Sequence, residues 1–362
     1  MTSPAYPAAR TAARRVHPHY ARNLAGFDGA ELELLPDVET IEAIIDAAFW
    51  ASLRREEVYT PKVSLAFVSP AMVPLPLIFE RPVALASQPL TRLGPAVERP
   101  GIHLCVSRES GDLVVWGAAR NLPRFCFVLE VVAPGLLILK HSRGDGSGKF
   151  VNVAVLQGDE VKVIDQTSAS AYERDPMDSV NVIMQLAVSM RDHGRGGTLL
   201  VVPSITQTWR ESILHPITYS VAPAFRALVN LMEEDPPERA GRRWQEALRR
   251  LVAGIAGLTA VDGATIITEH YELVAFGAKI IRPRGRHQVG RVMVTEPIEG
   301  AESVVAEPGQ LGGTRHLSAA QFAQDQRDSI ALVASQDGRF TLFGWSPRDQ
   351  MVGANRIETL LF

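Results

Sequence analysis

The stretch GRGGTLLVVPS (residues 194–204) predicts a buried strand, because an unbroken apolar run lies between glycines and a proline. The preceding residues, 179–192, repeat apolar side chains at helical spacing, on one face formed by Val180, Ile183, Met184, Ala187 and Met190. A helix that leads into a buried strand is the repeating unit of layered α/β domains. The stretch therefore predicts an α/β fold for the C-terminal half of the chain.

The same alternation continues toward the C-terminus. A loop and a helix are predicted within 232–258, and another helix over 318–326. Further short apolar runs predict strands at ATIIT (264–268), LVAFGAKII (273–281), RVMVTEP (291–297), SIALVAS (329–335) and RFTLFGW (339–345). We expect one mixed-sheet α/β domain over residues 176–362.

The N-terminal half is predicted to be a smaller, β-rich α+β domain over residues 25–168. An amphipathic helix is expected from Pro36 to Glu57, followed by seven strands between residues 62 and 165 that turn signals separate into antiparallel meanders. The basic segment 1–24 is expected to be a flexible arm, and the polar stretch 166–178 is expected to link the domains.

Composition restricts the classes of partner. The 362 residues carry a net charge of −3, which gives no basic excess for nonspecific nucleic-acid binding, and no specific nucleic-acid motif is evident. No apolar run reaches the length of a membrane span, and the N-terminus lacks the apolar core of a secretory signal. Cys105 and Cys126 are too few for a disulfide scaffold. We expect a cytoplasmic protein without membrane partners.

Two segments of the second domain are candidates for chemistry. In VDGATII (261–267), Asp262 opens an apolar strand, so its carboxylate is expected at the sheet edge where ligands approach α/β folds. Asp-Gly is also an ordinary turn, which is the alternative interpretation.

The second segment, GGTRHLSAA (312–320), combines glycines with donor side chains. Gly312 and Gly313 allow close approach to a ligand, while Thr314, Arg315, His316 and Ser318 offer hydroxyl, guanidinium and imidazole groups. Ser318 and Gln321 fit a capping box that would aim a helix N-terminus at the same place, which suits a polyphosphate. A plain capped helix with solvated side chains is the alternative.

These two segments, in this order and about fifty residues apart, resemble the DGA and GTRHR motifs of the diadenylate cyclase family. The resemblance covers about 176–350, including GRGGTLLVVPS and a late turn, Ser335-Gln336-Asp337, where the family has S-E-E. The N-terminal segments FWASLRREE (49–57) and LVVWGAAR (113–120) are similar to probable sensor domains that precede divergent cyclase domains.

The resemblance implies a nucleotidyltransferase that condenses two ATP molecules, held face to face by two subunits, to the second messenger cyclic di-AMP with Mg²⁺ or Mn²⁺. A homodimer or higher homo-oligomer is then expected. Asp262, Arg315 and His316 would be catalytic, and Asp262 and Asp337 would bind the metal. The nucleotide, ATP or a cyclic dinucleotide, would contact Gly263, Ala264, Gly313, Thr314, Ser318, Ser335 and Gln336.

Two departures from the family motifs leave an alternative open. Leu317 stands where the motif has its second arginine, and Gln336 places an amide where a metal-binding carboxylate is expected. The alternative is a catalytically degenerate cyclase domain that binds a nucleotide and signals through the N-terminal sensor-like domain. A third hypothesis is a scaffold that binds no ligand.

Overall fold

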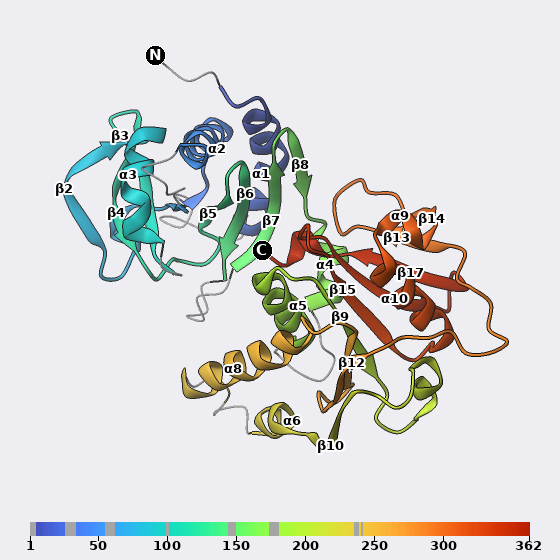
Figure 1. Cartoon of the computed structure of the whole chain (residues 1–362). Coiled ribbons are helices and arrows are strands. Elements are labelled where there is room, and N and C mark those ends of the chain that lie inside the picture. Colours follow the sequence, from blue (N-terminus) through green and yellow to red (C-terminus); the bar gives the residue numbers. More distant parts are fainter. Residues whose placement is uncertain are drawn as a thin grey trace. The chain divides into compact units, whose positions relative to one another are not determined.

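The computed structural model describes residues 5–25, 34–54, 62–98, 101–143, 150–173, 181–234, 239 and 242–362. The chain divides into two compact units (Figure 1). Unit 1 comprises Met1–Gln166 together with Phe362, and unit 2 comprises Thr167–Leu361. Both are mixed α and β structures, as the sequence predicts.

Unit 1 is built on an eight-stranded sheet with the order β2-β4-β3-β1-β5-β6-β7-β8. All neighbours are antiparallel except β1 and β3, which are parallel, so the expected meander is interrupted there. The strands are β1 (Ser64–Phe67), β2 (Leu77–Ala84), β3 (His103–Glu109), β4 (Asp112–Ala119), β5 (Phe127–Ala133), β6 (Leu136–Ser142), β7 (Phe150–Gln157) and β8 (Glu160–Val163).

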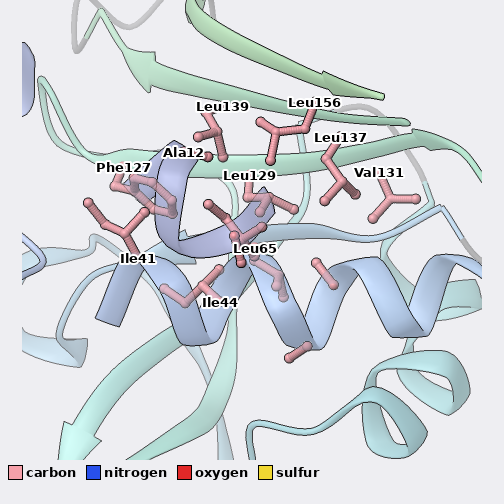
Figure 2. Close-up of a cluster of buried hydrophobic side chains, with 14 of the residues drawn as sticks. Ala12, Ile41, Ile44, Leu65, Phe127, Leu129, Val131, Leu137, Leu139 and Leu156 are labelled. Carbon is pink, nitrogen blue, oxygen red and sulfur yellow. The ribbon is translucent and has the colours of Figure 1, made fainter. Parts of the chain in front are cut away.

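The helices of unit 1 are α1 (Pro7–Leu24), α2 (Val38–Ser52), α3 (Ser87–Val97) and the short 3₁₀ turn η2 (Pro70–Met72). Helix α2 begins after Asp37, whose carboxylate accepts a hydrogen bond from the Thr40 amide at 2.7 Å. Isoleucines of α2 and alternate residues of the strands form one apolar core, which Figure 2 shows between helix and sheet. This core accounts for the predicted amphipathic pattern.

The expectation of a flexible arm over residues 1–24 is wrong for the residues described. Pro7–Leu24 form helix α1, whose small apolar side chains, including Ala12, Ala13 and Val16, are fully buried in the same core. The ring of Tyr6 stacks on Phe49 of α2 with the centroids 3.7 Å apart. The N-terminal segment is therefore part of the packed unit.

Unit 2 is built on a nine-stranded sheet with the order β10-β12-β11-β9-β15-β16-β17-β13-β14. The pairs β9–β11 and β13–β17 are parallel and the others antiparallel, so the sheet is mixed. The strands are β9 (Gly197–Val202), β10 (Tyr219–Phe225), β11 (Ala264–Thr268), β12 (Leu273–Ala278), β13 (Val292–Thr295), β14 (Val304–Ala306), β15 (Ile330–Ala334), β16 (Phe340–Ser346) and β17 (Met351–Arg356).

Helices cover both faces of the unit 2 sheet. Leu199 and Val201 of β9 belong to the core that packs on α5, α6 and α8, while Leu200 and Val202 belong to the core that packs on α10. Burial on both faces explains why residues 199–202 of β9 are apolar without alternation. The helices of unit 2 are α5 (Val182–His193), α6 (Ala227–Met232), α8 (Arg242–Leu258), α9 (Pro308–Leu311) and α10 (Thr314–Asp325), with 3₁₀ turns η3 (Thr208–Ser212) and η4 (Glu358–Leu360).

The stretch expected as a linker, 166–178, begins as helix α4 (Gln166–Glu173). Residues 174–178 lie outside the described residues. Within the part of the chain that the structure describes, no helix is long and apolar enough to cross a bilayer.

Candidate functional site

The candidate site of unit 2 lies at one edge of the sheet, where β9 and β11 begin and β12 ends. Ala264 pairs with Thr198 of the parallel strand β9 and with Ala278 of the antiparallel strand β12. The amino ends of β9 and β11 thus meet the carboxyl end of β12. Asp262 lies at the amino end of its strand, not at the carboxyl ends where α/β sheets ordinarily bind ligands.

A cavity of about 200 Å³ opens at this edge. Helix α10 contributes its first turns to the wall, and the strand ends contribute the rest. The lining residues are Thr198, Asp262, Gly263, Ala264, Ala278, Lys279, Ile280, Thr314, Arg315 and Ser318. The structure therefore brings residues of the two candidate sequence segments to one place.

The backbone conformation at residue 263 requires glycine. Its φ angle is +115°, a conformation that residues with a Cβ rarely adopt. A Cβ there would also lie 2.5 Å from the carbonyl carbon of Gly277 on β12. The backbone at Gly277 can approach this closely only because Gly263 lacks a side chain.

The carboxylate of Asp262 is paired with a lysine that the sequence analysis did not single out. Lys279 Nζ donates a hydrogen bond to Asp262 Oδ2 at 2.5 Å. This hydrogen bond, together with the charges of Lys279 and Arg315, holds the pKa of Asp262 below its usual value. The carboxylate is ionised at neutral pH and already has a cationic partner.

Helix α10 presents two different faces. Thr314, Arg315 and Ser318 line the cavity, as their three- and four-residue spacing on a helix allows. The helix begins at Thr314 after Gly313, so the expected capping box of Ser318 and Gln321 is wrong. Gln321 is buried instead, and its side chain bonds the backbone of Val289 and His287.

His316 does not join these donors. Its side chain turns into the core, where 2% of its surface is exposed and its ring meets Phe343 edge-on. Burial lowers the pKa of His316, and Nε2 has no hydrogen-bond partner among the described residues. The expected role of His316 as a ligand-facing imidazole therefore does not agree with its position.

Leu317 lines a second cavity of about 290 Å³, next to the first. The two cavities share Ile280 and Ser318. The remaining residues of the second wall are Ile281, Arg282, Gln288 and Gln321. At the position of the motif's second arginine, the chain thus has an apolar side chain, in a wall that also contains Arg282.

The late turn, Ser335-Gln336-Asp337, joins β15 to β16 as a hairpin, with the Ser335 amide donating to the Arg339 carbonyl at 2.9 Å. The carboxylate of Asp337 is 3.3 Å from the Arg339 guanidinium. None of the three residues lines the cavity of Asp262. Gln336 nevertheless lies near the cavity, because it and the cavity residue Arg315 both flank Gly196. A Cβ on Gly196 would lie 3.0 Å from Arg315 Nη1 and 3.4 Å from Gln336 Cγ.

The arrangement does not fit a divalent metal ion. Of the two expected ligands, Asp262 is paired with Lys279, and Asp337 is paired with Arg339 outside the cavity. Among the described residues, no group of three His, Cys, Asp or Glu side chains is placed to hold a metal. Sites for Mg²⁺ need oxygen ligands that are free to coordinate.

Unit 1 carries a separate group of polar side chains. Leu65 and Leu104 face the helix-covered core, so their neighbours Ser64 and His103 face the opposite side of the sheet. A hydrogen bond of 2.7 Å joins Ser64 Oγ to His103 Nδ1. Burial lowers the pKa of His103 to about 4, so the imidazole is neutral at pH 7.

Comparison with known proteins finds a family match within unit 1. Residues 30–120 match the family model described as "Probable sensor domain DACNV". The matched range lies in unit 1 and includes α2, α3 and β1 to β4. The search of curated proteins finds no match for the chain. The likeness of unit 2 to cyclases accordingly rests on the residues of its own two segments.

Proposed function

We propose that unit 2 binds a nucleoside polyphosphate such as ATP, or a cyclic dinucleotide, and that the chain is a nucleotide-binding signalling protein with a sensor-like unit 1. The observation that supports this is the set of donors around one cavity. Lys279 and Arg315 contribute cations, and Thr314 and Ser318 contribute hydroxyl groups. The sensor-like unit is supported by the family match at residues 30–120.

This set of groups suits phosphate chemistry. Ammonium and guanidinium groups form short, charge-assisted hydrogen bonds with phosphate oxygens, and guanidinium can do so in a bidentate manner. The first turn of a helix also has backbone N–H groups without acceptors in the helix, and α10 begins at the cavity with Thr314. The neighbouring cavity, which is lined by Leu317 and by polar residues such as Arg282, has room for another part of the same ligand.

Binding without catalysis is the version that we favour. Three groups that the family motif would supply for chemistry are missing from the cavity or already paired. Asp262 is paired with Lys279, His316 lies in the core, and Leu317 stands where the motif has an arginine. In this version the chain is a catalytically degenerate cyclase that reports nucleotide occupancy.

The second candidate is a diadenylate cyclase that condenses two ATP molecules to cyclic di-AMP. Asp262 favours it, because its carboxylate lies in the wall of the donor-lined cavity. In this candidate, Mg²⁺ or Mn²⁺ would be required and Asp262 would first have to leave Lys279. Because one cavity holds one nucleotide, ring closure would need a second copy of the chain, and we would expect a homodimer or higher homo-oligomer.

Binding is tested by titration calorimetry of the full chain with ATP and with cyclic di-AMP. We expect Arg315→Ala to weaken binding by about tenfold, since a lost charge-assisted contact is worth about 1.5 kcal/mol or more. Arg348→Ala, an exposed arginine away from the cavity, is the matched control. Absence of binding, or equal weakening in both variants, would contradict the proposal.

The choice between the two candidates is tested by product analysis. The full chain is incubated with ATP and Mn²⁺, and the products are identified by mass spectrometry. Cyclic di-AMP that disappears in Asp262→Asn would establish the cyclase. Nucleotide binding without product would leave the degenerate form.

A further inference from the structure

Lys279 is held at the cavity by its backbone as well as by its ion pair. It follows the last residue of β12, and its carbonyl accepts a hydrogen bond from the Leu214 amide at 2.9 Å. Ile280, the next residue, forms a bridge with Ile213. Lys279 is also the only lysine in residues 163–362, where all the other permanent cations are arginines. The backbone hydrogen bonds around Lys279 therefore fix where its ammonium group enters the cavity.

The charges in the cavity wall are unequal in number. Lys279 and Arg315 are cations, Asp262 is an anion, and the other lining residues are uncharged, so the wall carries one net positive charge. The Lys279 ammonium group has three N–H donors, of which the contact with Asp262 uses one. Among the described residues the other two donors have no partner, and they can reach phosphate oxygens because half of the side-chain surface of Lys279 is exposed.

We infer that Lys279 takes the place of a divalent cation in this site, so that unit 2 binds nucleotide polyphosphate without Mg²⁺ or Mn²⁺. The inference rests on the proposed nucleotide binding and goes further by naming the charged form of the ligand, the metal-free polyphosphate. A divalent ion at Asp262 would have to displace a hydrogen-bonded ammonium group or lie beside it against charge repulsion. A lysine that donates to both Asp262 and a phosphate oxygen, beside the guanidinium of Arg315 that gives the wall its net positive charge, takes the place of such an ion.

The ordinary alternative is a surface ion pair without function. The Asp262 side chain is largely exposed and the Lys279 side chain is half exposed, and exposed ion pairs contribute little to stability. This alternative predicts that neither residue affects nucleotide affinity. The inferred role predicts opposite effects for the two residues, because removing Lys279 makes the cavity less positive and removing Asp262 makes it more positive.

The test is calorimetric titration of the full chain with ATP, once in EDTA and once in excess Mg²⁺. For the wild-type protein we expect dissociation constants within about threefold of one another in the two buffers. Lys279→Met should weaken binding in EDTA by about tenfold and Mg²⁺ should partly restore it, because the carboxylate is then free for the ion. Asp262→Asn should bind ATP in EDTA as tightly as the wild type or more tightly.

Two further arms keep the test decisive. Arg284→Met removes an exposed cation near Lys279 in sequence but outside both cavities, and should change neither dissociation constant. Amine-reactive labelling followed by mass spectrometry should find Lys279 protected by ATP in EDTA.

Contrary outcomes are distinguishable. If wild-type binding needs Mg²⁺ and Asp262→Asn abolishes it, the inference is overturned while nucleotide binding stands. If Lys279→Met and Arg284→Met behave alike, Lys279 has no part in the site and the inference is again overturned. If no variant binds ATP in either buffer, the proposed function fails, and the inference fails with it.

Discussion

The imidazole of His316 occupies the space that a side chain on Gly312 would need. A Cβ on Gly312 would lie 2.3 Å from His316 Nδ1, and the histidine cannot move away because it is packed in the core. We expect Gly312→Ala to lower the free energy of unfolding by about 1–3 kcal/mol, as overpacking of a core does. Gly313→Ala is the control, since a Cβ there meets nothing within 4 Å. Urea unfolding measures both, and equal stabilities would contradict this packing.

Gln336→Glu should weaken nucleotide binding if no chemistry occurs. The new carboxylate would lie near Arg315, which flanks the same glycine, and would compete with phosphate for the guanidinium. We expect about a fivefold loss of ATP affinity in calorimetry, equivalent to about 1 kcal/mol. Gln350→Glu, in the exposed turn before β17, is the control.

Gln336→Glu combined with Leu317→Arg tests the cyclase candidate. The pair restores the charges of the family motif, so a cyclase weakened by these two positions should form cyclic di-AMP faster by about a hundredfold. Mass spectrometry of products after incubation with ATP and Mn²⁺ measures the gain, and Asp262→Asn should remove it. Binding without product in every variant would exclude this candidate.

The stability of unit 1 should fall in mild acid because of His103. Its pKa is near 6.5 when unfolded and about 4 when folded, so below pH 6.5 the unfolded chain binds the proton more readily. The contribution of neutral, buried His103 to the free energy of unfolding is complete above pH 6.5 and is lost as the pH falls toward 4. At pH 5 the free energy of unfolding is lower by about 2 kcal/mol. Urea unfolding at pH 7 and pH 5 should show a smaller difference for His103→Gln. An unchanged difference would contradict the assignment.

Helix α1 should be intolerant of charge on its buried face. Ala12→Asp places a carboxylate in a fully buried position, and we expect a loss of about 3 kcal/mol or more. Thr11→Asp, one residue earlier, is exposed and should have little effect. Thermal unfolding distinguishes the two. Similar melting temperatures would mean that α1 does not pack as described.

Much of unit 2 could be predicted because its core strands are marked by composition. Runs such as TLLVV and ATIIT are largely apolar and are bounded by glycine, proline or a charged residue, and they lie in strands β9 and β11. Strand β10 gave no comparable signal, because it is an edge strand with mostly exposed residues and contains Pro223. Edge strands lack the burial that makes a pattern visible.

Helix α1 was missed for a related reason. Its core face consists mainly of alanines, which add little hydrophobicity, and Pro18 lies inside the helix. The signal that could have found it is the repeat of small residues at three- and four-residue spacing, with Pro7 at the first helical position.

The candidate site was predictable in part. Asp262, Thr314, Arg315 and Ser318 line one cavity, and all four belong to the two singled-out segments. The orientation of His316 depends on where the helix begins, and a start at Thr314 turns the histidine inward. Lys279 reaches Asp262 only through the pairing of Ala264 with Ala278, a register that sequence spacing does not reveal.

The close contact of Gly263 with Gly277 limits what the presence of a D-G-A motif says about activity. Gly263 is constrained by the neighbouring backbone, so natural selection would retain this letter of D-G-A in any descendant that keeps the fold, whether or not it keeps an activity. The informative letters are those whose side chains enter the cavity without holding the sheet together, Asp262 and Arg315 among them. The glycine alone is therefore no evidence that a descendant keeps an activity.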